Sequence, residues 1–539
     1  MSLPTAHEDT FARDRLPDSE DWPCFLLDLP ELHYPERLNA AAELLDRHIQ
    51  AGDGDRIAVV FEDNQWTYAQ LAEKANQVAH VLTRDMGLVP GNRVLLRGFN
   101  NPMMVASWFG VLKAGGIAVA TMPMLRARDL APIVEKAKIS HALCDERLAE
   151  ELEKTRALGE NLARIGYFSA LGESKTDFDR TMARKSKKFD PVPTLSDDVA
   201  LIAFTSGTTG KPKGTVHFHR DIMSMCHCVG QDLLGIKVGD RVIGSPPIAF
   251  TFGLGALVTF PLQAGATVIL LENGSPPSLA KAIERYRASW CFTAPTAYRA
   301  MLGELDEVDL SSLKNCVSAG EHLPLPVFES WKKATGISLI NGLGSTEMIH
   351  IFISAAGRDI RPGATGKAIG GYQARVVDEE LKDVPVGEVG KLAVRGPTGC
   401  RYLDDERQKV YVQDGWNLTG DAYRMDEDGY FWFMARTDDM IVSSGYNISG
   451  PEVEEVLLSH PAVQECAVIG APDPQRGQVV KAFVVPTEPY EGCSKLVLAL
   501  QDHVKEHIAP YKYPREIAFL DKLPKTETGK IQRFKLKNL

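Results

Sequence analysis

The decapeptide Thr-Ser-Gly-Thr-Thr-Gly-Lys-Pro-Lys-Gly at residues 205–214 follows directly on the apolar run Val-Ala-Leu-Ile-Ala-Phe at residues 199–204. The apolar run predicts a buried strand, and the decapeptide then lies at a strand end, where α/β folds bind their ligands. Glycine lets backbone N–H groups approach phosphate oxygens, and hydroxyl and ammonium groups complete the cradle. The stretch therefore predicts an α/β fold with a loop that binds a nucleoside triphosphate.

The residues of this loop that we expect at the phosphates are Thr205, Ser206, Gly207, Thr208, Thr209, Gly210, Lys211 and Lys213. The loop is not the P-loop of nucleotide-binding ATPases, because Pro212 and the positions of the lysines break the spacing G-x-x-x-x-G-K-[ST]. An ordinary flexible linker rich in glycine, serine and threonine is the alternative.

Strand and helix patterns alternate from about residue 58 to residue 292. They predict strands at 57–61, 93–96, 266–271 and 290–292, with helices at 68–86 and 278–287. Such alternation is typical of mostly parallel sheets covered by helices. After Gly366 the pattern changes to short strands, expected at 374–377, 391–394 and 430–433, which predicts a β-rich, barrel-like subdomain over residues 366–435.

A polar segment at 436–439 separates this subdomain from a strand expected at 440–442. The residues beyond it carry their own α+β pattern, with helices expected at 451–459 and 495–507 and strands at 464–469 and 482–486. At 539 residues the chain is longer than one core usually supports. We therefore expect an N-terminal domain at 1–437 and a small C-terminal domain at 438–539.

The composition argues against several classes of protein. Asp and Glu outnumber Lys and Arg by 71 to 60, an acidic balance that argues against non-specific nucleic-acid binding. The nine cysteines are scattered, which suits a reducing cytoplasm, and Cys226-His227-Cys228 lacks the second pair that structural zinc sites use. Neither a signal peptide nor a run of about 18 apolar residues is visible, so we expect a cytoplasmic protein without a membrane segment.

Three further motifs carry chemistry. Asn-Gly-Leu-Gly-Ser-Thr-Glu at 341–347 follows a strand expected at 337–340, and there Thr346 offers a hydroxyl to a phosphate and Glu347 a carboxylate to Mg²⁺. Leu-Thr-Gly-Asp at 418–421 ends in an acid suited to ribose hydroxyls, with an ordinary turn acid as the alternative. In Leu-Pro-Lys-Thr-Glu-Thr-Gly-Lys at 523–530 the glycine can project Lys530, which alone would be a surface lysine.

The order of these motifs, together with Arg-Thr-Asp-Asp at 436–439, Gly445 and Glu-Val-Glu at 452–454, resembles the adenylate-forming superfamily of acyl-CoA synthetases, adenylation domains and luciferases. The resemblance runs from about residue 45 to the C-terminus. It implies a large N-terminal domain of two sheets with a small β-barrel, and a mobile C-terminal domain. It also implies a two-step reaction: a carboxylate attacks the α-phosphorus of ATP to give an acyl-adenylate and pyrophosphate, and a thiol, that of CoA, then displaces AMP.

The resemblance assigns roles to residues of this chain. Lys530 would bridge the carboxylate and the α-phosphate, Thr346 would hold the α-phosphate, Glu347 would bind Mg²⁺, Asp421 and Arg436 would hold the ribose, and Asn341 and Gly342 with Gly320 and Glu321 would complete the nucleotide site. Asp438 would be the hinge about which the C-terminal domain rotates, bringing the Gly445 loop to the thiol. The segment 440–445 lacks the lysine that many relatives carry near position 443, so no role is assigned to such a lysine.

The acid substrate follows from the expected pocket residues, which are Thr251, Phe252, Gly253, Ala319, Leu343, Gly344 and His350. The segment 246–253 lacks the aspartate with which amino-acid-activating relatives pair an α-ammonium group. The segment 345–352 resembles benzoate- and 2-aminobenzoate-CoA ligases, in which the histidine faces the substrate; a purely structural role for His350 is the alternative. Thr251 is a candidate partner for an ortho substituent of the ring.

Three other functions stay open. They are a free-standing adenylation enzyme that loads an aryl acid onto a carrier protein, a medium-chain acyl-CoA ligase, and a nucleotide-binding scaffold without activity. The expected partners are an aromatic carboxylate, ATP and CoA, with assembly as a homodimer a further expectation.

Overall fold

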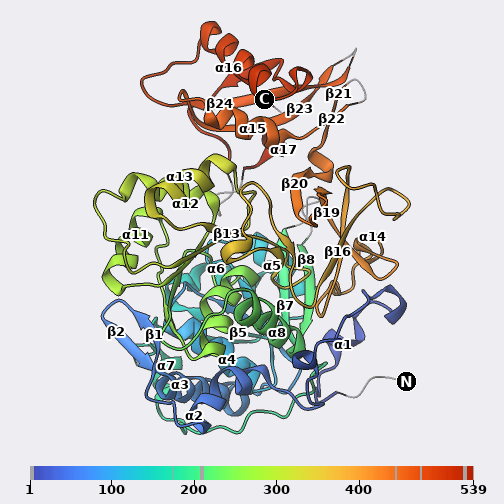
Figure 1. The fold of residues 1–539 in the computed structure, drawn as a ribbon. Helices are drawn as coiled ribbons and strands as arrows, with labels where there is room; N and C mark the ends of the chain where they lie inside the picture. Colours follow the sequence, from blue (N-terminus) through green and yellow to red (C-terminus); the bar gives the residue numbers. More distant parts are fainter. Residues whose placement is uncertain are drawn as a thin grey trace.

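The computed structural model describes residues 5–173, 175–206, 212–443, 446–473, 476–525, 531–537 and 539. Four sheets organise this part of the chain (Figure 1). Two large sheets with their helices form the body, a barrel-like sheet lies beside them, and the fourth sheet caps the body at one end. The expected α/β class is thereby confirmed.

The largest sheet has nine strands, and its central six are parallel to one another. Antiparallel strands complete both edges. In spatial order the strands are β15 (Lys367–Ala368), β14 (Ile351–Ser354), β13 (Leu339–Gly344), β12 (Asn315–Ala319), β11 (Trp290–Thr293), β9 (Arg241–Gly244), β10 (Thr267–Ile269), β1 (Ile57–Phe61) and β2 (Asn64–Thr67).

The second large sheet has six strands, of which the last pair is antiparallel and the others parallel. Its order is β6 (Arg164–Phe168), β5 (His141–Asp145), β3 (Arg93–Arg97), β4 (Ile117–Thr121), β7 (Val199–Ser206) and β8 (Pro212–Phe218). The strand expected at 199–204 is therefore confirmed, and it is longer than predicted. The ends of the decapeptide belong to the strands, with Thr205 opposite Lys213, because β7 and β8 pair along most of their length.

Helices fill the space between these sheets and cover them. Helix α4 (Pro102–Lys113) is buried along its whole length, and its Trp108 belongs to a core cluster that also contains residues of both large sheets. Helix α3 (Tyr68–His80) begins with a capping box between Thr67 and Gln70 and continues as a π-helical turn at Val81–Asp85, within the range predicted for it. The other helices of this part are α1 (Phe11–Asp14), α2 (Arg47–Gln50), α5 (Ala127–Lys136), α6 (Ala149–Ala157), α7 (Asp177–Ala183), α8 (His219–Met225), α9 (Thr251–Leu254), α10 (Phe260–Ala264), α11 (Pro276–Tyr286), α12 (Pro295–Met301), α13 (Leu325–Thr335) and α14 (Gln408–Tyr411).

The expected β-rich subdomain is present, and its strands form an antiparallel sheet. Its strands are β16 (Gln373–Val377), β17 (Val389–Arg395), β19 (Trp416–Met425) and β18 (Val412–Gln413), with β20 (Phe431–Arg436) paired to β19. The fourth sheet comprises β22 (Tyr446–Ile448), β21 (Ile441–Ser443), β24 (Gly477–Pro486), β23 (Val463–Asp473) and β25 (Glu516–Phe519), with helices α15 (Gly450–Ser459), α16 (Ser494–His507) and α17 (Arg533–Leu536). Helix α15 contacts α13 and β20, so this part of the chain rests on the edge of the body.

One sequence prediction was wrong in a way that affects the site. Residues 341–344 do not form a loop after a strand but belong to β13 itself, because they pair with β12 on one side and β14 on the other. Glycine permits this close packing, since a Cβ on Gly342 would lie 2.4 Å from the Ile351 side chain. The chain leaves the strand only after Gly344.

Residues 5–36, which we call the N-terminal strap, run over the body and reach the barrel-like sheet (Figure 1). The Cys24 N–H donates to the Gly415 carbonyl at 2.8 Å, and the Leu26 N–H donates to the Gly396 carbonyl at 3.0 Å. The strap therefore ties the start of the chain to residues near position 400.

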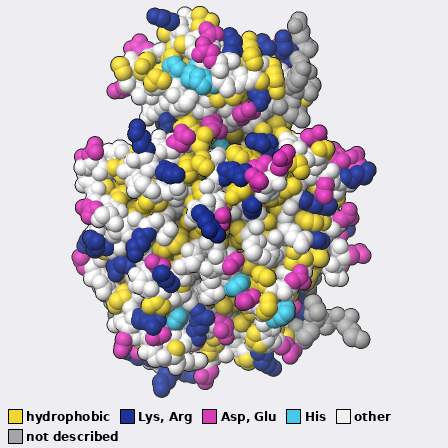
Figure 2. All heavy atoms as spheres, viewed as in Figure 1, with side chains coloured by type: hydrophobic (Ala, Val, Ile, Leu, Met, Phe, Trp, Pro, Cys, Tyr) yellow, Lys and Arg dark blue, Asp and Glu magenta, His cyan; other side chains and the backbone are white. Residues whose placement is uncertain are grey.

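The visible surface carries Lys and Arg side chains interspersed with Asp and Glu, and on this face no one sign of charge dominates (Figure 2). None of the helices in the described part of the chain is long and apolar enough to cross a membrane.

Candidate active site

A triangle of polar side chains lies at the expected phosphate side. The Tyr402 hydroxyl donates to Glu347 Oε1 at 2.6 Å, and Lys213 Nζ lies 2.9 Å from the Tyr402 oxygen and 3.4 Å from the same Glu347 oxygen. The structure thus brings together Lys213 and Glu347, which are far apart in sequence. Residues 207–211 of the decapeptide lie outside the described residues, as does the side chain of Ser206.

The turn that carries Thr346 and Glu347 is strained. Ile349 has φ of 64°, in the left-handed region that β-branched residues rarely adopt. Such strain persists only where the surroundings enforce it, and it concentrates at functional sites. The turn places Glu347 and His350 on different sides of the same short segment, one within the polar triangle and the other among aromatic rings.

A buried polar chain holds this turn from behind. His217 Nε2 lies 2.8 Å from the Thr346 carbonyl oxygen, and its Nδ1 lies 3.7 Å from Asp221. Asp221 pairs with Arg401, and both side chains are fully buried. Burial acts to raise the pKa of Asp221, but the positive charge of Arg401 together with the nearby His217 and Arg220 outweighs it and brings that pKa down to about 2.

Sequence reasoning missed His217, Asp221, Arg401 and Tyr402. The only signal for His217 and Asp221 was their position in and just after the strand that leaves the decapeptide. Nothing in the sequence around residue 401 indicates its partner, because the contact depends on an isolated bridge between Thr215 and Tyr402 that joins two distant segments.

The two residues expected at the ribose lie opposite each other on β19 and β20. The Arg436 guanidinium donates to Asp421 Oδ1 at 2.8 Å and to the Thr419 carbonyl at 3.1 Å. Burial raises the pKa of Asp421, while the charge of Arg436 opposes that shift. Gly420 has φ of 74°, and a Cβ there would lie 2.9 Å from the Arg436 guanidinium, so only glycine fits without moving the arginine.

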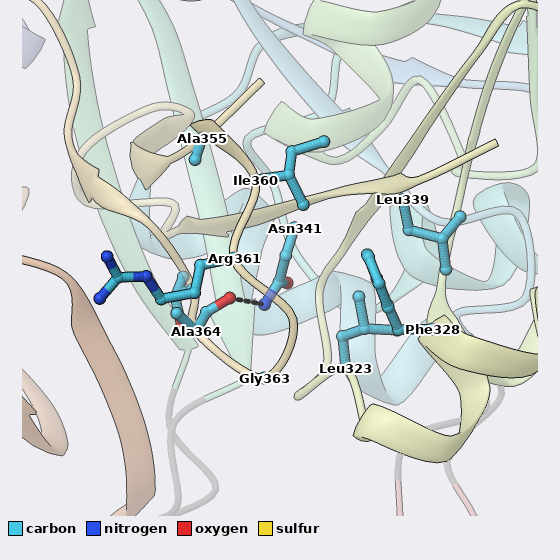
Figure 3. A pocket seen from close by; sticks show the side chains of 10 residues that line it. Leu323, Phe328, Leu339, Asn341, Ala355, Ile360, Arg361, Gly363 and Ala364 are labelled. Atoms are coloured by element: carbon cyan, nitrogen blue, oxygen red, sulfur yellow. Dashed lines mark hydrogen bonds between the residues drawn. The ribbon is translucent and has the colours of Figure 1, made fainter. Parts of the chain in front are cut away.

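A shallow depression next to β13 is lined by Leu323, Phe328, Leu339, Asn341, Ala355, Ile360, Arg361, Gly363, Ala364 and Thr365 (Figure 3). The Asn341 amide donates to the Ala364 carbonyl at 3.5 Å and lies at its centre. Gly320 has φ of 89°, and no atom lies within 4 Å of the position a Cβ would take there. Of the residues expected at the adenine, Asn341 therefore lines the depression, and Gly320 borders open space directly after β12, with the half-buried Glu321 next to it in the chain. Gly342, also expected at the nucleotide, packs against Ile351.

Of the residues expected at the acid substrate, Phe252 and Gly344 lie against His350, which is 3% exposed. Its ring lies 5.7 Å from the ring of Phe252 and 4.6 Å from that of Phe260, measured between centroids. Burial lowers the pKa of His350 to about 3, so the ring is neutral at physiological pH. His350 Nε2 faces the Phe252 carbonyl at 3.4 Å, and Nδ1 has no partner among the described residues.

Small residues shape the wall beside these rings. A Cβ on Gly255 would lie 2.5 Å from the His350 ring, and one on Gly253 would lie 2.0 Å from the Pro247 carbonyl. Gly344 is equally tight against the backbone of His350. Thr251 and Ala319 are buried and Leu343 half-buried. The wall is thus aromatic, neutral and closely packed.

Glu347 fits a magnesium site by the chemistry of its side chain. Within the described ranges there is no group of three or more His, Cys, Asp or Glu side chains able to hold a metal ion together. Mg²⁺ is commonly bound by one or two carboxylates with substrate phosphates and water. One carboxylate near Lys213, which we expect at the phosphates, therefore suits Mg²⁺ bound together with a nucleotide.

The remaining predicted residues cannot be placed. Lys530 and Gly445 lie outside the described residues, and Asp438 is described only by its backbone, in the 3₁₀ turn Thr437–Asp439. Their roles stay predictions.

Comparison with known proteins gives matches along most of the chain. Residues 45–401 match the model of the AMP-binding enzymes, and residues 452–530 match that of the AMP-binding enzyme C-terminal domain. A benzoate–CoA ligase from Thauera aromatica is 35% identical over 520 residues, covering 94% of this chain and 97% of the relative. A mitochondrial acyl-coenzyme A synthetase, ACSM3, from Mus musculus is 32% identical over 529 residues, covering 94% and 91%. The crystal structure of an anthranilate CoA ligase in complex with anthranoyl-AMP superposes with a TM-score of 0.90 at 35% identity, covering 95% of this chain and 98% of that one.

Proposed function

The chain belongs to the AMP-binding enzyme family, and on this premise we propose that it is an ATP-dependent acid–thiol ligase that converts an aromatic carboxylate, 2-aminobenzoate or benzoate, to its CoA thioester. The reaction passes through an acyl-adenylate and releases pyrophosphate and AMP. The observation that carries the aromatic substrate is the wall of Phe252, Phe260 and neutral His350, which offers flat, apolar faces to a ring. Aromatic rings pack well against such faces.

One short turn joins the aromatic wall (Phe252, Phe260 and His350) to the polar triangle (Lys213, Glu347 and Tyr402). This arrangement suits a substrate with an apolar ring and a reacting carboxylate. Only two residues separate Glu347 from His350. A ring held at His350 therefore presents its carboxylate toward the phosphate side. Attack of a carboxylate on a triphosphate is slowed mainly by repulsion between anions, so positioning and charge neutralisation supply most of the catalysis.

The residues divide this work. Lys213 and the rest of the decapeptide hold the β- and γ-phosphates, Thr346 holds the α-phosphate, and Asp421 with Arg436 holds the ribose. Mg²⁺ bound at Glu347 would neutralise phosphate charge. Lys530 bridges the carboxylate and the α-phosphate in the first step. We propose that residues 438–539 then rotate as a domain about Asp438, which brings the Gly445 loop to the CoA thiol.

Pyrophosphate release with a panel of acids tests the substrate. The panel is benzoate, 2-aminobenzoate, hydroxybenzoates, phenylacetate and hexanoate. We expect benzoate or 2-aminobenzoate to give the highest kcat/KM. If hexanoate gave a higher value than benzoate, the aryl proposal would fail in favour of a medium-chain acyl-CoA ligase.

Two further measurements separate the other functions. A carrier-loading enzyme would form little thioester with free CoA, whereas the proposed ligase forms it at a rate that depends on CoA concentration. A nucleotide-binding scaffold would release as much pyrophosphate after Lys530→Ala as before it. Assembly as a homodimer stays a prediction, which light scattering of the purified protein can test.

A further inference from the structure

We propose that Tyr402 is a positioning residue for the metal site: its hydroxyl holds one oxygen of the Glu347 carboxylate and leaves the other for Mg²⁺, while Lys213 provides the counter-charge that Mg²⁺ replaces. The proposal rests on the proposed function, because it assigns a supporting residue to the same site. Tyr402 belongs to none of the motifs that the sequence pointed to.

Among the described residues, the side-chain hydrogen bonds to the Glu347 carboxylate are one-sided. Both Tyr402 and Lys213 reach Oε1, at 2.6 Å and 3.4 Å. A carboxylate held by one oxygen in this way keeps its orientation, and outer partners of this kind fix metal ligands in many proteins. The turn that carries Glu347 is strained at Ile349. Because a strained backbone persists only where its surroundings hold it, contacts such as that of Tyr402 help to fix the position of the carboxylate.

Tyr402 is itself held firmly. It lies in the segment that bridges to β8 at Thr215, flanked by hydrogen bonds of 2.8 Å from the Val216 N–H to the Arg401 carbonyl and from the Leu403 N–H to the Gly214 carbonyl. Its side chain is 1% exposed, and its ring packs edge-on against that of Tyr411 with centroids 5.8 Å apart. Tyr402 is therefore anchored to the strand that also carries Lys213.

The hydroxyl acts as donor toward Glu347. A phenol is protonated at neutral pH, and a carboxylate oxygen only accepts, so the hydroxyl is the donor of this pair. Its single proton goes to the carboxylate at 2.6 Å, and its oxygen then accepts from Lys213 Nζ at 2.9 Å. The hydroxyl thus joins the acid and the base of the site without carrying charge.

Lys213 occupies the position of a counter-ion. Its ammonium group lies near both oxygens of the triangle and 5.0 Å from the centroid of the Tyr402 ring. Its side chain is 22% exposed, so it has room to move. When Mg²⁺ binds the same carboxylate, repulsion between the two cations favours release of Lys213 toward the phosphates, where its charge is needed.

Tyr402→Phe tests the proposal, with Tyr411→Phe as the matched control. Phenylalanine keeps the ring contacts with Tyr411 and Lys213 and removes only the hydroxyl. Tyr411 is the neighbouring half-buried tyrosine, and its hydroxyl lies 3.4 Å from Ser345 Oγ. Calorimetry of the full-length protein with a non-hydrolysable ATP analogue, at a series of Mg²⁺ concentrations and with EDTA, gives the affinity for metal separately from that for nucleotide.

We expect Tyr402→Phe to weaken the apparent affinity for Mg²⁺ by about tenfold or more, as loss of an outer partner typically does. The affinity of Tyr402→Phe for the ATP analogue in EDTA should stay within about twofold of the wild-type value. For Tyr411→Phe, the affinity for Mg²⁺ and the affinity for the analogue should both stay within that range. An unchanged affinity of Tyr402→Phe for Mg²⁺ would overturn the proposal. So would an equally large loss of its affinity for the ATP analogue in EDTA.

A second comparison tests the proposal even if Tyr402→Phe also lowers the free energy of unfolding. In a Glu347→Gln background, Tyr402→Phe should cause no further loss of Mg²⁺ affinity, because the hydroxyl acts through that carboxylate. An added loss as large as in the wild type would mean that Tyr402 acts by another route. If the wild-type protein bound the analogue with no effect of Mg²⁺, the proposed function itself would fail, and this outcome is distinct from both others.

Discussion

Replacing Gly255 by alanine adds one methyl group to the wall of the proposed substrate pocket. Gly255 begins the π-helical segment Gly255–Thr259, and a Cβ there would lie 2.5 Å from His350 Cδ2 and Nε2 and 2.8 Å from the ring of Phe260. Ordinary contacts begin near 3.4 Å, so the imidazole must recede by about 1 Å. The methyl group enters on the Phe260 side, so the imidazole moves into the space proposed for the substrate ring.

The size of the effect follows from the packing. Overpacking by one methyl group in a dense core costs about 1–3 kcal/mol. Because the displaced ring takes up space proposed for the substrate ring, bound substrate must push it back, and most of the cost then falls on the complex. If all of it does, kcat/KM for the aromatic acid falls by about 5- to 150-fold.

Pyrophosphate release with saturating ATP and varied benzoate measures this change. Gly303→Ala is the control, because no atom lies within 4 Å of the Cβ position at Gly303. A kcat/KM for Gly255→Ala within twofold of the wild-type value, with the acids in the same rank order, would refute the placement of the ring against His350. A loss equal for every acid, hexanoate included, would do the same.

Three other changes have expected outcomes. Gly420→Ala should raise KM for ATP by about tenfold, because its Cβ would displace the Arg436 guanidinium. The control Gly429→Ala has a similar positive φ but no neighbour within 4 Å, so it should leave KM for ATP within about twofold of the wild-type value. Equal KM values for the two variants would contradict the ribose role. Arg401→Met should lower the free energy of unfolding by about 3–5 kcal/mol, since it leaves the Asp221 carboxylate buried without its partner, and urea unfolding would show this or refute it. Because the pKa of Asp221 is about 2 in the folded protein and about 3.9 in an unfolded chain, its stabilising charge is present above about pH 4 and lost as pH falls through 2. The stability gap between wild type and Asp221→Asn should therefore narrow between pH 4 and pH 2, and a constant gap would contradict the assignment.

Much of the architecture was predictable because strand and helix periods are local. The strand expected at 57–61 is β1, and the helix expected at 495–507 agrees with α16 to one residue. The ends of strands were predicted less well where glycines occur. Gly342 marks close packing between neighbouring strands and not the end of one, and only the partner strands reveal the difference.

The candidate active site likewise contains residues that the sequence predicts and residues that it does not. Glu347, Asp421 and Arg436 lie in motifs with a fixed order, so the amino-acid sequence alone points to them. Tyr402 and Arg401 carry no local signal, because their partners are more than 50 residues distant in the chain. Supporting residues of this kind are defined by long-range contacts, which one sequence does not reveal.

The N-terminal strap affects the order in which segments of the chain can reach their folded positions. Trp22 and Phe25 lie against the buried Arg401 guanidinium, with 5.6 Å and 4.8 Å from its carbon to the ring centroids, and the Asp21 carbonyl accepts from Gln408 across 387 positions of sequence. During synthesis, domains generally fold from the N-terminal end onward. These contacts, however, cannot form until residues beyond 408 have left the ribosome. The strap is made before the residues that it contacts, yet it is among the last segments to reach its final place, and until then the aromatic cover over Arg401 is missing.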